Sequence, residues 1–189
     1  MPKEPKKYVT EFTAFFQNLI DTSDFTYETL AKKIGIGQGA IHHWFRSDDV
    51  RLSRIILVTN ALGYDLQIAI APKPYQLNGQ NPHYFSFAEM ERLKLKKLHF
   101  LKAAMKDAGL TNVILAEKIG ISVSAITYWF VSDNITIKNL VASAEAMGRD
   151  LYLRCVKDDS ATYKEKGTGI HMEVVKTQRW NVVDAILKR

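Results

Sequence analysis

Apolar residues recur at helical spacing through the first sixty residues, and then the spacing changes to that of a strand. Leu66, Ile68 and Ile70 alternate with polar or small residues, which is the period of a half-buried strand. Thr26 is placed to cap the second helix, and Gly35 and Gly63 are placed to end helices. The predicted helices cover residues 8–22, 27–34, about 38–46 and 51–62.

The same pattern returns 85 residues later without a gap, so residues 11–70 align with 96–155. The segment LAKKIGIGQGAIHHWFRSDD begins at Leu30, and LAEKIGISVSAITYWFVSDN begins at Leu115. Most identical positions are apolar or glycine, so the repeated feature is a core with its turns. We therefore expect the second copy to use Thr111, Gly120, Ser122 and Gly148 as its caps and turns, and to end in a strand over 150–156.

Small residues lie where the two short helices of each copy have to touch. Ala31 and Ala116 fall at the contact between the helices, and Gly35 and Gly120 fall in the turn, where a positive φ is easiest for glycine. With the apolar positions of each copy facing inward, the opposite face of the second helix faces solvent. The inward set is Leu30, Ile36, Ile41 and Trp44 in the first copy, and Leu115, Ile121, Ile126 and Trp129 in the second.

Both copies share one motif: Leu-Ala, three residues, Gly-Ile, four residues, Ile, two residues and Trp. This motif resembles that of the phage lambda repressor/Cro-like helix-turn-helix family. The resemblance implies a mainly α fold with two tandem helix-turn-helix units, each followed by a short strand. In that family the first helix of the motif crosses the DNA backbone and the second enters the major groove. It therefore implies sequence-specific binding of double-stranded DNA, as in a transcriptional regulator.

The resemblance also implies which side chains meet the duplex. Gln pairs with adenine and Arg with guanine in the major groove, and threonine and amide groups at helix starts lie near phosphates. The expected base-reading residues are Gln38, Gly39, His42, His43 and Arg46 in the first unit, and Ser124, Thr127 and Tyr128 in the second. The expected phosphate-contacting residues are Thr26, Lys32 and Thr111.

The remaining segments divide the chain into four parts. Three prolines and a glycine over 71–86 favour a linker. Residues 88–107 are expected to form one long helix. After the second strand, residues 170–174 are expected to return as a hairpin strand, and Trp180, Val183, Ile186 and Leu187 fit a final amphipathic helix. The expected parts are 1–72, the linker 73–87, the second unit 88–156, and an extension of strand and helix over 157–189.

The strand at 65–70 has no local partner, and a strand this short does not stand alone. Two pairing partners are possible for this strand. Pairing with the sheet of the other unit would make one chain a pseudo-dimer, and pairing with the same strand of a second chain would make a homodimer.

Charge adds little to this picture. The 189 residues carry a net charge of +6, which hints at a polyanionic partner. The surplus lies in 71–110 and 156–189, whereas residues 1–70 and 111–155 each carry as many acidic as basic side chains. The neutral units leave an alternative function open: an antitoxin-like or regulatory module that uses its helix-turn-helix surfaces to dock proteins.

Other classes of function find no support in the sequence. Cys155 is the only cysteine, and His42 and His43 point about 100° apart on a helix, so neither a disulfide nor a metal site is expected. No phosphate loop, nucleophile elbow or catalytic carboxylate pair is recognisable, so we expect neither an enzyme nor a cofactor. No secretory signal or membrane-spanning run is apparent, which favours a cytoplasmic protein with no membrane contact.

Overall fold

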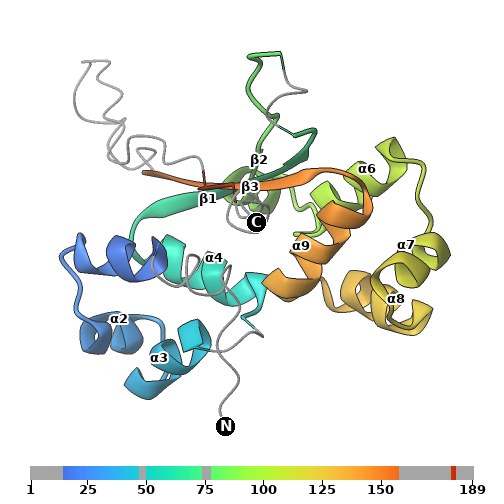
Figure 1. Cartoon of the computed structure of the whole chain (residues 1–189). Helices are drawn as coiled ribbons and strands as arrows, with labels where there is room; N and C mark the ends of the chain where they lie inside the picture. The colour runs from blue at the N-terminus through green and yellow to red at the C-terminus, as the bar shows by residue number, and fades with distance from the viewer. Residues whose placement is uncertain (1–14, 47–49, 74–77, 158–179, 182–189) are drawn as a thin grey trace, which may run out of the picture.

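The computed structural model describes residues 15–46, 50–73, 78–157 and 180–181. Within them, helices are arranged below and on both sides of an antiparallel sheet (Figure 1). Residues 15–21 are helical, and the further helices are α2 Tyr27–Lys33, α3 Gln38–Arg46, α4 Leu52–Ala61, α5 Phe87–Arg92, α6 His99–Asp107, α7 Asn112–Ile119, α8 Val123–Ser132 and α9 Ile137–Ala146. The strands are β1 Tyr64–Ala71, β2 Phe85–Ser86, β3 Asp150–Lys157 and β4 Trp180–Asn181.

The sheet joins the two copies of the repeat. Its strand order is β2-β1-β3-β4, and all neighbours are antiparallel. The strands β1 and β3 pair along their whole length, from Tyr64 opposite Lys157 to Ala71 opposite Asp150. Of the two partners that the sequence left open for the first strand, pairing within the chain is confirmed.

The register of this pairing has approximate twofold symmetry. At the centre of the ladder Ile68 lies opposite Leu153, and these two residues are counterparts in the repeat, 85 positions apart. A second antiparallel bridge joins another pair of counterparts, Arg51 and Thr136. An approximate twofold axis therefore passes through both pairs, from the sheet to the N-terminal ends of α4 and α9.

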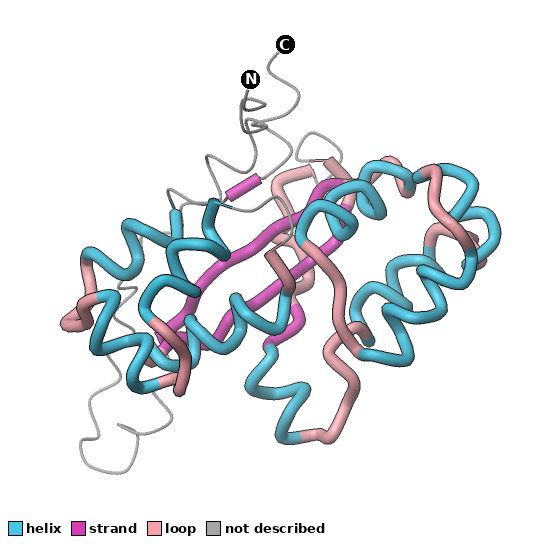
Figure 2. Tube along the Cα trace, turned by 90° about the horizontal axis from the view of Figure 1, so that it is seen from below, coloured by secondary structure: helices cyan, strands magenta, loops and turns pink. Residues whose placement is uncertain are grey.

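The helices follow this symmetry. In Figure 1 the strands cross the upper part of the molecule, α4 and α9 lie below them, and α2–α3 and α7–α8 lie on opposite sides. Seen from below, the two helical groups again flank the long strands (Figure 2).

The turns of the two copies are built alike, as the sequence predicts. Gly35 and Gly120 both have a φ of +72°, in the left-handed region that glycine enters without strain. Behind each glycine, the N–H of Ile36 donates to the carbonyl of Ala31 at 3.0 Å, and its counterpart bond in the second copy measures 3.1 Å. Thr26 and Thr111 cap the helices that precede these turns, because each side chain accepts a backbone N–H three residues on.

One core runs through both copies. Leu30, Ile41, Leu115, Ile126 and Trp129 are buried, and the other inward positions, Ile36, Trp44 and Ile121, are half-buried and pack against the same core. Ala31 and Ala116 are buried at the helix contacts as expected. The structural similarity of the copies also includes the helix before each turn, since Phe15 and its counterpart Phe100 are both buried.

The prediction of a single helix over 88–107 is wrong. The chain forms α5 and α6 instead, separated by a loop in which Lys94 has a φ of +54°. The N–H of Leu95 donates to the carbonyl of Met90 at 2.8 Å and closes α5. The carboxylate of Asp133 then accepts the backbone N–H groups of Lys97 and Leu98, just before α6 begins. A tertiary contact thus interrupts a locally helical sequence.

Two expectations for the strands also need correction. Trp180 does not start a helix, because Trp180–Asn181 is β4 and pairs with Tyr152 and Leu153 of β3. The expected strand at 170–174 and the rest of the expected helix lie outside the described residues. The first strand is not half-buried, because Asp65, Ala69 and Ala71 on its second face are buried along with Leu66 and Ile68.

A short strand and a helix start lie where the sequence favours a linker. Phe85 and Ser86 form β2 and pair with Ile68 and Gln67 of β1. The buried carboxylate of Asp65 accepts the N–H of Ala88, in the first turn of α5, at 2.9 Å. This bond explains why a charged residue is buried in β1, since a carboxylate at a helix start satisfies otherwise unpaired amides.

We predict that Ile68→Ala lowers the free energy of unfolding by about 2–4 kcal/mol, because it opens a cavity at the centre of the ladder that joins the copies. Urea unfolding followed by circular dichroism checks this. Val156→Ala is the control, since Val156 is exposed in the adjacent strand. Two separate unfolding transitions, with one copy unfolding before the other, would contradict the shared core.

Candidate nucleic-acid interface

The helix α3 presents a polar face to solvent. Gln38, Gly39, His42 and His43 are exposed, whereas Ile41 between them is fully buried. Arg46 is the last residue of the same helix. The structure therefore brings the base-reading residues expected in the first unit onto one helix, with no acidic residue in its first turn.

Tyr27 holds the ring of His42 in place. The two rings stack with centroids 4.4 Å apart and planes 13° from parallel. Burial raises the pKa of Tyr27, with a smaller contribution from the charge of Asp21, so its hydroxyl stays protonated and able to donate. Tyr27 was not among the expected contact residues, and the signal that could have found it is its position next to the helix cap Thr26.

The helix α8 presents a different face at the matching positions. Ser124, Thr127 and Tyr128 are exposed, while Ile126 and Trp129 are buried. Apolar side chains extend this face: Val131 is 71% exposed and Val123 40% exposed. The two faces thus differ in chemistry, since basic and amide groups in the first copy correspond to hydroxyl and apolar groups in the second.

The small hydroxyl groups of α8 already have partners. Thr127 Oγ1 donates to the carbonyl of Val123 at 3.0 Å, and Ser124 Oγ lies 2.9 Å from Ser122 Oγ. Each hydroxyl retains acceptor capacity for an incoming donor. Tyr128, 63% exposed, presents the largest group on this face.

The expected phosphate-contacting residues lie at the starts of α2 and α7 and on the exposed side of α2. Thr26 and Thr111 are exposed caps, and Lys32 is exposed in the last turn of α2. The adjacent Lys33 has a structural role instead. Its Nζ donates to the carbonyl of Ala61 at 2.7 Å and lies 4.4 Å from the centre of the Phe25 ring.

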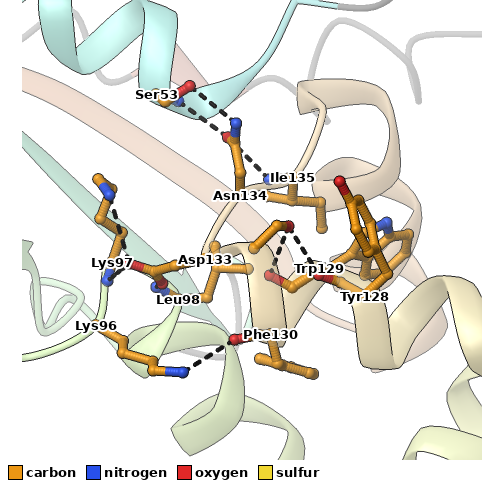
Figure 3. Close-up of polar contacts among 11 residues, drawn as sticks. Ser53, Lys96, Lys97, Leu98, Tyr128, Trp129, Phe130, Asp133, Asn134 and Ile135 are labelled. Atoms are coloured by element: carbon orange, nitrogen blue, oxygen red, sulfur yellow. Dashed lines mark hydrogen bonds and ion pairs between the residues drawn. The ribbon is translucent and has the colours of Figure 1, made fainter.

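The end of α8 is fixed to the loop before α6 (Figure 3). Asp133 has a φ of +52°, and its carboxylate accepts the N–H of Lys97 at 2.9 Å and that of Leu98 at 3.0 Å. The Nζ of Lys96 reaches the carbonyl of Phe130 at 3.3 Å. The first contact satisfies backbone amides just before α6 and the second a carbonyl near the end of α8, so the position of this helix depends on the loop.

The loop after α8 also contacts the first copy (Figure 3). The side-chain oxygen of Asn134 accepts the N–H of Ser53 at 3.3 Å, and its amide nitrogen donates to Ser53 Oγ at 2.9 Å. Two backbone bonds lie beside this contact, from Leu52 N–H to the Ile135 carbonyl and from Ile137 N–H to the Val50 carbonyl. The segments that follow α3 and α8 are therefore bonded to each other.

The described residues hold no metal-ligating cluster. Within them, no three His, Cys, Asp or Glu side chains gather where they could hold a metal ion. Burial, with a smaller effect of Asp65, raises the pKa of Cys155 to about 12. No single helix of the described chain is long and apolar enough to cross a membrane. The pair α7 and α8 passes that test only when taken together, across a bend of 116°.

Residues 101–153 match a family model described as helix-turn-helix. The match covers α7, α8 and α9 with parts of α6 and β3, all within the second copy of the repeat. The 116° angle between α7 and α8 is also typical of the two helices of that motif. This segment therefore has the geometry of a helix-turn-helix. No curated protein and no solved structure matches the chain.

We predict that Asp133→Ala lowers the free energy of unfolding by about 2–4 kcal/mol, because it leaves two amides unpaired and puts alanine at a positive φ. Asp133→Asn keeps an acceptor and tolerates that φ, so its loss should be less than half as large. Urea titration of both variants measures the difference. A negligible loss in Asp133→Ala would contradict the role given to the carboxylate contacts.

We predict that the thiol of Cys155 in the folded protein does not react with an aromatic disulfide reagent at pH 8. A pKa of about 12 leaves almost no thiolate at that pH, and the side chain is buried. The same protein in denaturant should react within minutes, as an ordinary cysteine does. Equally fast reaction of the folded protein would disprove the burial of this strand.

Proposed function

We propose that the chain binds double-stranded DNA with both copies of the repeat, α3 and α8 acting as recognition helices in successive major grooves. The leading support is the position of these two helices. They lie at equivalent places on either side of an approximate twofold axis, and each exposes most of its expected base-reading residues. Tandem helix-turn-helix units in one chain then act as an intramolecular pseudo-dimer.

The family-model match carries the DNA-binding assignment for the second copy, and the repeat extends it to the first. Both copies share the capped first helix, the glycine turn and the buried second-helix positions. These shared features set the angle at which the second helix is presented. We propose that transcriptional regulation in the cytoplasm is the role of this binding.

The two recognition faces call for two unlike half-sites. Gln38, His42, His43 and Arg46 suit hydrogen bonding to purine edges, with Gly39 leaving room for close approach. Ser124, Thr127 and Tyr128 offer weaker polar groups, and the neighbouring valines suit the methyl groups of thymine. Thr26, Lys32 and Thr111 contact the phosphates that fix the register.

A second candidate function is docking of another protein on the second copy. Val113, Val123, Tyr128 and Val131 are all strongly exposed on α7 and α8. A contiguous apolar surface commonly marks a protein interaction site. On this reading the second copy contributes nothing to DNA affinity, so the two candidates differ in a measurable way.

We predict that selection from random duplexes recovers a non-palindromic site with two halves about one turn, or roughly 34 Å, apart. On that site, the paired changes Gln38→Ala with His42→Ala should lower affinity about 10- to 100-fold and remove protection of one half. The pair Ser124→Ala with Thr127→Ala should weaken the other half by a smaller factor. Gel-shift titration and footprinting measure both effects.

Asn60→Ala is the matched control, because Asn60 is exposed in α4 away from the recognition helices. It should leave affinity and both footprints unchanged. A perfectly palindromic selected site would argue against the pseudo-dimer. Absence of a shift at low salt would disprove DNA binding and favour protein docking, since phosphate contacts are strongest there.

A further inference from the structure

We infer that Arg51 enters the minor groove at the centre of the DNA site, midway between the two half-sites. This inference rests on the proposed function and adds a third contact to it. The starting observation is the place of Arg51 on the approximate twofold axis, opposite its repeat counterpart Thr136.

Strand geometry determines where this side chain points. The N–H of Leu52 donates to the Ile135 carbonyl at 2.8 Å, and the N–H of Ile137 donates to the Val50 carbonyl at 2.9 Å. These four flanking residues are all buried. Successive side chains in an extended pair point to opposite faces. Arg51 and Thr136 therefore point away from the core, and Arg51 is exposed.

The bridge lies on the side of the molecule that the recognition helices share. Its two residues come within five positions of the ends of α3 and α8, and they join the N-terminal ends of α4 and α9. The sheet lies at the other end of the axis, beyond the C-terminal ends of these helices (Figure 1). A duplex bound by α3 and α8 therefore passes across the bridge and not across the sheet.

The geometry of the duplex then defines what Arg51 meets. When two recognition helices occupy successive major grooves on one side of DNA, the minor groove faces the protein halfway between them. A narrow minor groove in A·T-rich DNA concentrates negative potential and attracts arginine. Arg51 has the chemistry for this contact because its guanidinium is always charged and weakly hydrated.

The contact belongs to one copy alone. Thr136 is short, and its hydroxyl accepts the N–H of Asn139 as the cap of α9. Arg51, at the equivalent position before α4, makes no side-chain capping bond. Its side chain is therefore free of that structural role, and its replacement leaves the start of α4 unchanged.

The test uses three duplexes that differ only in the four central base pairs of the selected site: A·T, G·C or inosine·C. Inosine lacks the 2-amino group of guanine, so inosine·C resembles A·T in the minor groove and G·C in the major groove. We expect the wild-type chain to bind the A·T and inosine·C duplexes about tenfold more tightly than the G·C duplex. Fluorescence anisotropy at fixed salt measures the three affinities.

Arg51→Ala should abolish this preference, and Arg51→Lys should reduce it. Arg54→Ala is the charge-matched control. Arg54 is also exposed and lies 4.8 Å from the centre of the Trp44 ring, so its loss should leave the preference at its wild-type value. Using the ratio between duplexes separates a groove contact from a general loss of positive charge.

An unchanged preference in Arg51→Ala, or an inosine·C duplex that binds like G·C, overturns this inference and leaves the proposed function standing. Failure of the wild-type chain to bind any duplex overturns both.

Discussion

Each copy of the repeat ends in a strand of eight residues whose backbone groups need a partner along at least one edge. The strands β1 and β3 supply that partner to each other, and their ladder is centred on two counterpart residues, Ile68 and Leu153. Because the pairing is antiparallel and centred in this way, it relates the two helical groups by an approximate half turn. The positions of α3 and α8 follow from this constraint and from the matching bridge at Arg51 and Thr136.

The two copies have a symmetric backbone arrangement, but their exposed recognition faces differ. Most residues shared between the copies cap helices, form turns or fill the core, whereas the exposed faces of α3 and α8 carry different residues. His42 stacks on Tyr27 in the first copy, whereas Thr127 and Asn112 occupy these positions in the second. A homodimer presents two identical faces. A fused pair can change one face without changing the other, which suits a target with unlike halves.

Local features of each copy were predictable from the sequence because they depend on neighbouring residues. Thr26, Gly35 and their counterparts act through bonds to residues a few positions away, and the burial of Ile41 and Ile126 follows from helical periodicity. The same periodicity placed the exposed faces of α3 and α8 correctly. The sequence also limited the partner of the first strand to two alternatives, but only the structure distinguishes them.

Features that depend on distant contacts were not predictable. The break between α5 and α6 requires the carboxylate of Asp133, more than thirty residues away, and burial of Asp65 requires the first turn of α5. The stack of Tyr27 on His42 and the outward direction of Arg51 likewise need the packing of separate elements. Periodicity describes one element at a time and carries no information about such contacts.

In the proposed complex, one chain supplies both recognition helices to one DNA site. Sedimentation of the complex, with the chain and the duplex followed at separate wavelengths, measures how many chains each duplex binds. We expect one chain per duplex carrying both half-sites, and the same ratio when the chain is in excess. Two chains on that duplex, each covering one half, would contradict it.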